Sequence, residues 1–426
     1  MIVSRLERPR IGVAVVGTGF FGAGLLRRLA AVPDFEPRVV ANRTLDHALD
    51  AIRRAGIASC QVVVTHDARE ARAALNAGRL VVTSDLLLPA ALDGVDVVAE
   101  ATGDVVVGSR VAHTAIQAGK HVVAANPETQ ATVGPILRVL ADANHVIYSD
   151  VDGDEPGLIR SLLDELASMG LEVAVAGNCK GVLKRYATPE SQAGFAARFG
   201  LKPWIATAAA DGTKLNFELT VVANASGLTP AVRGMRGPST DPEHLVEDYH
   251  RLQLLDGGHY VDYAHGLGSG VFAIVRSDHP EVQSDFRYLK LGEGPYYAFV
   301  RPLVMCHYHA PRSISRAAWL GEPTVAPLGA PVAETIAFAK RDLEAGAELD
   351  GIGGFDLYGL IVRADEAARE CLVPIGVAQY GRLRRSVRKD EPLEYDAVEF
   401  ASDNFALQLR RQQDALFGVQ VAAGAA

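Results

Sequence analysis

The first 150 residues alternate short apolar runs with longer segments in which apolar positions recur at helical spacing. The short runs are rich in β-branched residues and predict buried strands, whereas the longer segments predict helices. This alternation predicts a parallel sheet with helices on both faces. The predicted strands lie in IGVAVVG (11–17), PRVVANR (37–43), GVDVVAEATG (94–103) and KHVVAANPE (120–128).

The pattern changes near residue 150, where an acidic stretch precedes a long helical segment, GLIRSLLDELASMG (157–170). Beyond it, helices mix with short strands such as LEVAVAG (171–177) and GGHYVDY (257–263), the pattern of an α/β catalytic domain that we also expect to form a homo-oligomer. The fold class predicted is α/β: a doubly wound Rossmann sheet, an α/β catalytic domain and a small β-rich module. The expected boundaries are 1–155, 156–327, 328–400, and 401–426 for a final helix and tail.

The C-terminal part holds an internal repeat, in which KRDLEAGAELD (340–350) and RRSVRKDEPLE (384–394) align without gaps. Both copies predict strand-and-turn units, with Leu343 matching Val387. The basic run in the second copy is typical of a solvated sheet edge, with phosphate binding as the alternative. The last segment predicts a helix that begins after Ser402 as N-cap.

The amino-acid composition and net charge exclude some classes of binding partner. The chain has 426 residues, about half of them hydrophobic, and a formal net charge of −9, which offers no basic field for nucleic acid or an anionic membrane. No apolar run reaches the length of a membrane span, and the N-terminus lacks a signal-peptide layout, so we expect a cytoplasmic location. The four cysteines lie far apart and encode neither a disulfide framework nor a zinc knuckle. A small molecule is the expected partner.

The strongest local motif is GTGFFG, which directly follows the first strand and opens a helix. Glycines here allow a tight turn and let backbone N–H groups approach a pyrophosphate at the positive end of the helix dipole. The motif and the loops that close later strands at the same edge predict a dinucleotide site. Its residues are Gly17, Thr18, Gly19, Phe20, Phe21 and Gly22, followed by Ala101, Thr102, Gly103 and Asn126.

The end of the second strand predicts which dinucleotide binds. Asn42 stands where a site that prefers NAD would carry an acid for the ribose hydroxyls. Arg43, flanked by Asn42 and Thr44, suits a 2′-phosphate instead. The sequence therefore predicts NADP(H).

A lysine and two acids occur together in DGTKLNFE (211–218). On one helix Asp211, Lys214 and Glu218 would share a face, either as exposed ion pairs or as the wall of an active site. The apolar residues that follow favour a buried helix, and DGT predicts a turn that places Lys214 in the first helical turn. Such a lysine can polarise a carbonyl, with Asp211 and Glu218 positioning it. Lys180, between two glycines of GNCKG, is a further catalytic candidate or a surface loop lysine.

The acidic stretch near residue 150 offers oxygen ligands for a divalent cation such as Mg²⁺ or Mn²⁺, and an interdomain turn is the competing interpretation. The candidate metal ligands are Asp152, Asp154 and Glu155. His307 and His309 alternate as on a strand, which favours a packed or substrate-facing role over zinc binding. Three further residues are candidates for substrate contact: Tyr296, Tyr297 and Arg301.

The set GTGFFG, VVANRT (39–44), AEATG (99–103) and VVAANPE (122–128) resembles the N-terminal half of homoserine dehydrogenases. Over nearly the whole chain, a second set resembles a group of homoserine-dehydrogenase-like oxidoreductases that includes the 1-deoxy-D-xylulose 5-phosphate reductoisomerase-like enzymes. This set comprises DGDEPG (152–157), AGNCKGVLKRYATPE (176–190), DGTKLNFE and GPYYAFVRPL (294–303). The repeat-bearing C-terminus resembles the SAF domain. The resemblance implies an NADPH-dependent oxidoreductase that acts on CH–OH groups.

We therefore expect hydride transfer between NADPH and a small oxygenated carbonyl compound, with a sugar phosphate as a candidate substrate. One alternative is oxidation or reduction of the homoserine dehydrogenase type. Another is a sensor that binds NADP(H) without turnover.

Overall fold

The computed structural model describes residues 8–419, and the chain forms two compact units. The first unit comprises Met1–Asn126, Ile136–Gly153 and Met305–Thr324. The second unit comprises Pro127–Pro135, Asp154–Val304 and Val325–Ala426. Each unit has its own sheets and its own buried hydrophobic clusters.

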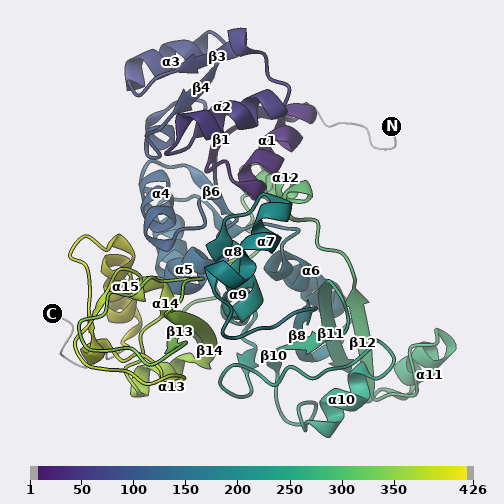
Figure 1. The fold of residues 1–426 in the computed structure, drawn as a ribbon. Helices are drawn as coiled ribbons and strands as arrows, with labels where there is room; N and C mark the ends of the chain where they lie inside the picture. Colours follow the sequence, from purple (N-terminus) through teal and green to yellow (C-terminus); the bar gives the residue numbers. More distant parts are fainter. Residues whose placement is uncertain (1–7, 420–426) are drawn as a thin grey trace. The chain divides into compact units, whose positions relative to one another are not determined.

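The first unit is built on a seven-stranded sheet in the order β3-β4-β2-β1-β5-β6-β7, and all the pairings are parallel (Figure 1). Its strands are β1 (Ile11–Val16), β2 (Phe35–Ala41), β3 (Val62–Val64), β4 (Leu80–Thr83), β5 (Val97–Glu100), β6 (His121–Ala124) and β7 (Tyr148–Asp150). The chain proceeds to one side of β1 through β2 and to the other side through β5. The crevice between β1 and β5 is therefore the switch point at which open α/β sheets bind ligands.

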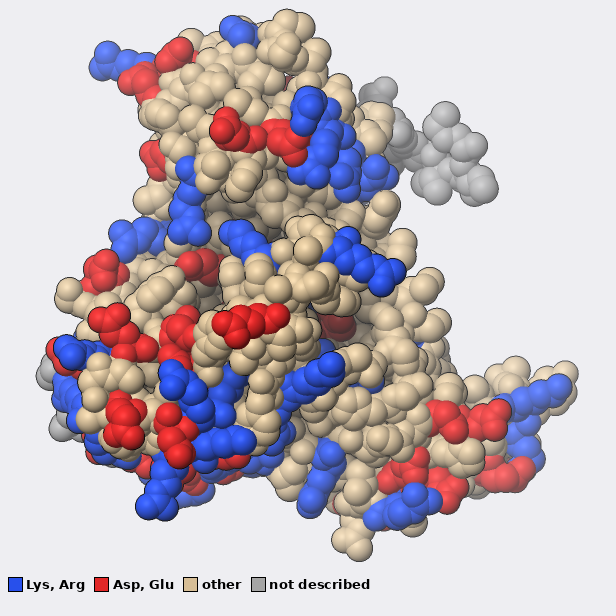
Figure 2. All heavy atoms as spheres, viewed as in Figure 1, with Lys and Arg blue, Asp and Glu red and all other residues tan. Residues whose placement is uncertain are grey.

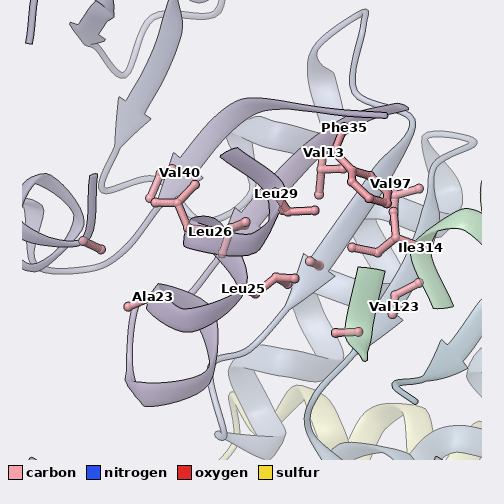
Figure 3. Packing of buried hydrophobic residues seen from close by; sticks show 14 of the residues in the cluster. Val13, Ala23, Leu25, Leu26, Leu29, Phe35, Val40, Val97, Val123 and Ile314 are labelled. Carbon is pink, nitrogen blue, oxygen red and sulfur yellow. The ribbon is translucent and has the colours of Figure 1, made fainter. Parts of the chain in front are cut away.

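Helices cover both faces of this sheet, as the alternating pattern predicts. They are α1 (Phe20–Ala31), α2 (Leu45–Arg54), α3 (Ala68–Asn76), α4 (Val105–Gln117) and part of α5 (Pro127–Ala143). Every residue of β1 is buried, because a parallel strand is covered on both sides. Leu25, Leu29, Val13 and Val97 belong to one buried cluster, and Figure 3 shows Leu29 of α1 close to Val13 of the sheet. The Rossmann part of the predicted fold class is confirmed.

A late segment of the chain completes this core. The helix α12 (Ala310–Ser315) packs Ala310 and Ile314 into the same cluster (Figure 3), although the sequence analysis assigned 305–324 to the catalytic domain. The strand expected for His307 and His309 is wrong, because Cys306–Tyr308 forms a 3₁₀ turn and Pro311 lies in the first turn of α12. His307 is packed in this unit, with its ring edge-on to Phe20, 5.6 Å between centroids.

The second unit has a five-stranded mixed sheet in the order β12-β11-β8-β10-β9. Its strands are β8 (Glu172–Lys180), β9 (Thr229–Pro230), β10 (Tyr260–His265), β11 (Gly270–Arg276) and β12 (Tyr296–Arg301). Its helices are α6 (Glu155–Ser168), α7 (Pro189–Phe199), α8 (Pro203–Asp211), α9 (Thr213–Ser226), α10 (Leu245–Arg251) and α11 (Pro280–Tyr288). The strands and the long helix predicted from the pattern are present.

The period of two along β8 assigns its side chains to two cores. Ala176 packs with Leu162 of α6 and Leu219 of α9 on one face. Val175 packs with Leu245 and Tyr249 of α10 on the other. Helix α9 is therefore an internal element, with almost every residue buried as predicted.

The C-terminal module, defined here as residues 332–399, also belongs to the second unit. It contains β13 (Ala333–Ala339), β14 (Leu357–Arg363), α13 (Ala364–Arg369), α14 (Ile375–Ala378), β15 (Arg382–Leu383) and β16 (Val398–Glu399). The two repeat copies pair with each other: Leu343 N–H donates to Val387 O at 2.8 Å, and Val387 N–H donates to Leu343 O at 2.9 Å. The module is β-rich as predicted, and its assignment as a SAF domain stays a prediction.

The final helix, α15, spans Phe405–Phe417. Its N-cap is Asn404 rather than Ser402, because the Asn404 side chain accepts a hydrogen bond from Leu407 N–H at 3.0 Å. The predicted tail from residue 420 lies outside the described residues. Within residues 8–419, no helix combines the length and apolarity needed to cross a bilayer. On the face shown in Figure 2, acidic and basic side chains are interspersed.

Candidate active site

The turn between β1 and α1 has the geometry that a dinucleotide requires. Gly17 has φ +93°, and a Cβ there would lie 2.5 Å from Ala101 O. A Cβ on Gly22 would lie 1.9 Å from Gly17 O, so helix α1 packs directly on the turn. Gly19 differs, because its Cβ would meet no atom of residues 8–419 within 4 Å, its own chain neighbours aside. This open position, before N–H groups of α1 that no N-cap side chain satisfies, is where a pyrophosphate fits.

Two polar residues connect this turn to the end of β2. The Asn42 side chain accepts a hydrogen bond from Thr18 N–H at 3.2 Å and donates to Thr44 O at 2.8 Å. The buried Thr18 hydroxyl has no hydrogen-bond partner among the described residues. Arg43 is exposed beside Asn42. Asn42 therefore shapes the loop, and Arg43 is free to meet a ligand.

The loops after β5 and β6 are joined by a buried acid, Glu100. Its carboxylate accepts from Thr102 N–H and Oγ1, both at 2.6 Å, and from Asn126 Nδ2 at 2.9 Å. Burial raises the pKa of Glu100, while the Thr102 and Asn126 donors oppose that shift. Ala101, Thr102, Gly103 and Asn126 thus form one connected edge at the carboxyl ends of the strands.

The second unit gathers charged side chains around Lys214, in what we call the lysine–acid cluster: Lys214, Glu218, Asp154, Glu155 and Glu128. The Lys214 ammonium donates to the Glu218 carboxylate, one helical turn away on α9. Its Nζ lies 3.6 Å from Asp154 Oδ2 and 3.9 Å from Glu155 Oε2. The Lys214 side chain is 30% exposed, whereas that of Glu218 is 4% exposed. One ammonium therefore faces several acids in a largely buried place, and its own side chain stays partly exposed.

Local sequence signals build this cluster at helix starts. Gly212 adopts φ +92° between α8 and α9, and Asp211 Oδ1 accepts from Thr213 N–H at 2.8 Å, so α9 begins one residue before Lys214. Asp154 is the N-cap residue of α6, and Glu155 lies in its first turn ahead of Pro156. A carboxylate in the first turn is favoured by the helix dipole. Glu128 lies in the first turn of α5.

The charges of the cluster perturb one another. Burial lowers the pKa of Lys214, but the carboxylates of Asp154, Glu218 and Glu155 outweigh burial and raise it well above its usual range. Burial and repulsion from Glu218 raise the pKa of Glu155. Burial also raises the pKa of Glu128, to about 7. Lys214 therefore stays protonated, whereas burial and mutual repulsion favour the neutral forms of Glu155 and Glu128.

Two residues on β8 extend the site. Asn178 Nδ2 donates to Glu218 Oε2 at 2.8 Å and fixes that carboxylate. Lys180 Nζ donates to Ala209 O at 2.9 Å, and burial lowers the pKa of Lys180 although Glu218 opposes the shift. Asn178 and Glu128 are not among the residues predicted from the sequence. The GNC and NPE motifs contained them, but no spacing linked them to Lys214.

The structure separates two predicted residues from this cluster. Asp211 forms an ion pair with Lys340 Nζ at 2.8 Å instead of holding Lys214. The left-handed Gly212 ends α8, so Asp211 and Lys214 do not share one helix face. Asp152 Oδ2 lies 3.0 Å from Arg312 Nη1 in the first unit, so Asp152 is not one of the three acids that approach one another.

The three aromatic and basic candidates of β12 also have other partners. Tyr297 is fully buried in the hydrophobic core of the second unit. Tyr296 donates its hydroxyl to Asp256 at 2.7 Å, and Arg301 pairs with Glu165. None of these contacts involves the lysine–acid cluster, because β12 is the edge strand of its sheet.

Comparison with protein families gives a match for the central part of the chain. Residues 153–310 match the model of the oxidoreductase DRL catalytic domain. This segment contains Asp154, Glu155, Lys180, Lys214 and Glu218. The predicted enzyme class, an oxidoreductase, is confirmed by this match. Comparison with curated protein sequences gives no significant match.

Several solved structures share a partial likeness. GenD2 from gentamicin A biosynthesis, determined with NAD, is 17% identical and gives a TM-score of 0.40 over 76% of this chain and 91% of its own. The 1-deoxy-D-xylulose 5-phosphate reductoisomerase from Zymomonas mobilis, determined with NADPH, is 16% identical and gives a TM-score of 0.39 over 72% of this chain and 71% of its own. A probable dehydrogenase from Thermotoga maritima is 11% identical and gives a TM-score of 0.44 over 75% of this chain and 91% of its own. At TM-scores below 0.5 such likenesses assign no function.

Proposed function

We propose that the chain is an NADPH-dependent oxidoreductase that reduces the carbonyl group of a small oxygenated compound, with a sugar phosphate such as 1-deoxy-D-xylulose 5-phosphate as the first candidate. The observation that carries this proposal is the Lys214 ammonium, held by three carboxylates and still partly exposed. It lies inside the segment that matches an oxidoreductase catalytic domain.

The chemistry assigned to this chain's residues is electrophilic. Lys214 donates a hydrogen bond to the carbonyl oxygen and stabilises the negative charge that develops there, as oxyanion donors do. Glu218, fixed by Asn178, holds the ammonium in position. Because the carboxylates raise the pKa of Lys214, it keeps its proton and acts as a charged hydrogen-bond donor and not as a base, and the proton that completes the reduction comes from solvent. Bound NADPH supplies the hydride.

The glycine turn of the first unit is the proposed place for this cofactor. The open position at Gly19 and the unpartnered Thr18 hydroxyl suit the pyrophosphate. Arg43 suits a 2′-phosphate, since a guanidinium binds phosphate with two parallel hydrogen bonds. This geometry favours NADPH over NADH.

The cluster also fits a divalent cation. Asp154, Glu155 and Glu218 each offer a carboxylate oxygen, and these atoms lie within 4.8 Å of one another. Oxygen ligands are those that Mg²⁺ and Mn²⁺ prefer, and a cation would stabilise the ionised form of Glu155, whose pKa burial and repulsion raise. A cation held there would polarise the substrate oxygen as a Lewis acid. Glu218 thus replaces Asp152 in the proposed ligand set.

The test follows NADPH absorbance with purified protein, 1-deoxy-D-xylulose 5-phosphate and Mn²⁺, with and without a chelator. Metal-dependent oxidation supports both the substrate and the cation site. Absence of oxidation, with NADPH binding shown separately, would overturn this substrate and direct the search to other oxygenated carbonyls.

Lys214→Ala tests the residue itself. We expect kcat to fall on the order of a hundredfold or more, because the variant loses the oxyanion donor. The exposed Lys202→Ala, in the same unit, is the matched control and should retain parental kcat. A Lys214→Ala kcat within about threefold of the parent would refute the assignment.

A further inference from the structure

Helix α9 carries polar side chains on two faces. With 3.6 residues per turn, Lys214 and Glu218 lie on one side of the helix. A second set lies roughly a third of a turn away: Thr213, Asn216, Thr220 and Asn224. All four are buried, so each needs a hydrogen-bond partner. The C-terminal module supplies these partners.

The side chains of this second set form hydrogen bonds with the C-terminal module, mostly with its backbone N–H groups. Thr213 Oγ1 accepts from Gly359 N–H at 2.9 Å, and Asn216 Oδ1 accepts from Ile361 N–H at 2.8 Å. Thr220 and Thr335 share a hydrogen bond of 2.8 Å between their hydroxyls. Asn224 Oδ1 accepts from Val332 N–H at 2.8 Å. The module is thus bonded along the length of the helix that carries Lys214.

One buried charge completes this connection at the start of the helix. Lys340, at the end of β13, is 5% exposed, and its ammonium lies 2.8 Å from Asp211 Oδ2. It also donates to Ala187 O at 2.8 Å and to Gly354 O at 2.6 Å, so two backbone carbonyls hold the ammonium beside the carboxylate. The other oxygen of Asp211 accepts from Thr213 N–H in the first turn of α9. Lys340 therefore contacts the start of α9 through one carboxylate.

We propose that Lys340 is a positioning residue for the active site: through Asp211 it fixes the first turn of α9, and with it the Lys214 ammonium. This inference rests on the proposed function of Lys214. It assigns to the C-terminal module a part in catalysis, although Lys340 contacts neither the lysine–acid cluster nor a substrate.

The geometry predicts an effect on turnover more than on binding. Loss of Lys340 leaves Asp211 without its ion-pair partner, and the first turn of α9 loses its fixed position. A displacement of about 1 Å in a catalytic group can reduce the rate by about a hundredfold. We expect Lys340→Met to lower kcat about ten- to a hundredfold, with KM for NADPH unchanged.

A control is needed because breaking any buried ion pair also destabilises the fold. Arg410 provides it: this buried residue pairs with Glu334 of β13 at 2.7 Å and with Asp414 at 2.8 Å, and neither contact involves α9. Arg410→Met leaves buried acids without a cation, as Lys340→Met does, and should retain parental kcat in the folded protein.

The experiment compares full-length Lys340→Met, Asp211→Asn, the double variant and Arg410→Met. Hydrogen exchange of the amides of residues 213–216 measures the position of the first turn, and steady-state kinetics measure turnover. The double variant should regain thermal stability relative to either single variant, because no buried charge remains unpaired, yet its kcat should stay low.

The outcomes separate this inference from the proposed function. Faster exchange at 213–216 and a lower kcat in both single variants, but not in Arg410→Met, support it. Exchange no faster than in Arg410→Met overturns it, as does a double variant that regains both stability and kcat. A parent without turnover on any carbonyl would refute the proposed function, and exchange would still decide whether Lys340 fixes the helix.

Discussion

At the scale of residues, Arg43 governs the proposed choice between the two dinucleotides. It is exposed just after β2, and its side chain forms no hydrogen bond or ion pair with another described residue. Arg43→Ala should lower kcat/KM for NADPH about ten- to a hundredfold, the effect of losing hydrogen bonds to a charged group. NADH lacks the 2′-phosphate, so its kcat/KM should change less than about threefold.

Steady-state kinetics with both cofactors check this prediction. Arg54→Ala is the control, because Arg54 is exposed in the last turn of α2 and pairs with Asp50. If Arg43→Ala lowers kcat/KM equally with NADPH and NADH, the residue supports the loop and does not bind the 2′-phosphate.

Contacts between side chains could be predicted from the sequence where the two residues are close together in the chain. Lys214 and Glu218 are one turn apart, so their ion pair follows from helical spacing. Asp154 and Glu155 were predicted as metal ligands without Lys214, and only the fold joins them to it. The distant acid Glu128 gives no such local signal. Whether these residues act in catalysis stays a prediction.

At the scale of elements, the apolar pattern predicted most strands and the start of α9. It failed where two signals competed. His307 and His309 alternate as on a strand, but Pro311 favours the first turn of a helix and starts α12. Ser402 and Asn404 are both good N-caps, and the structure uses Asn404, whose side chain reaches Leu407 N–H. Asp211 was placed on the helix of Lys214 because sequence does not show that Gly212 is left-handed.

The glycine turn offers an element-scale prediction, because its glycines have different surroundings. Gly19→Ala adds a Cβ that lies more than 4 Å from the atoms of every other described residue outside its own chain neighbours, so stability should change by less than about 0.5 kcal/mol. NADPH should bind at least about tenfold more weakly, because the methyl group occupies the place proposed for the pyrophosphate. Gly22→Ala adds a Cβ 1.9 Å from Gly17 O and should cost about 1–3 kcal/mol as well.

Denaturant unfolding and fluorescence titration of NADPH check the two glycine variants side by side. Normal NADPH affinity in Gly19→Ala would remove the pyrophosphate from this turn. Normal stability in Gly22→Ala would contradict the close packing of α1 on the turn.

At the scale of the whole molecule, the chain passes between its two units in ways that the sequence pattern does not show. The segments 127–135 and 305–324 each leave the unit of their sequence neighbours. The first segment lies in α5 and the second contains α12, but a helix does not reveal which core it joins, since long-range packing decides that. A boundary near residue 155 could be predicted from the acidic turn because there the composition itself changes.

Buried acids make the stability of the whole molecule depend on pH. Burial raises the pKa of Glu128 from its ordinary 4.5 to about 7, and that of Asp262 from 3.8 to about 6. The folded state therefore binds these protons more tightly than the unfolded state. The free energy of unfolding should decrease as the pH rises through this interval, most steeply for Glu128 between its unfolded and folded pKa values.

Glu128→Gln should remove the contribution of Glu128 to the pH dependence of the free energy of unfolding, since glutamine does not ionise. A shift from 4.5 to about 7 corresponds to at most about 3 kcal/mol. Urea unfolding between pH 5 and 8, with a chelator present to exclude cations, should show a flatter profile for Glu128→Gln than for the parent. The exposed Glu190→Gln is the control and should keep the parental slope. Parallel profiles for Glu128→Gln and the parent would contradict the raised pKa of Glu128.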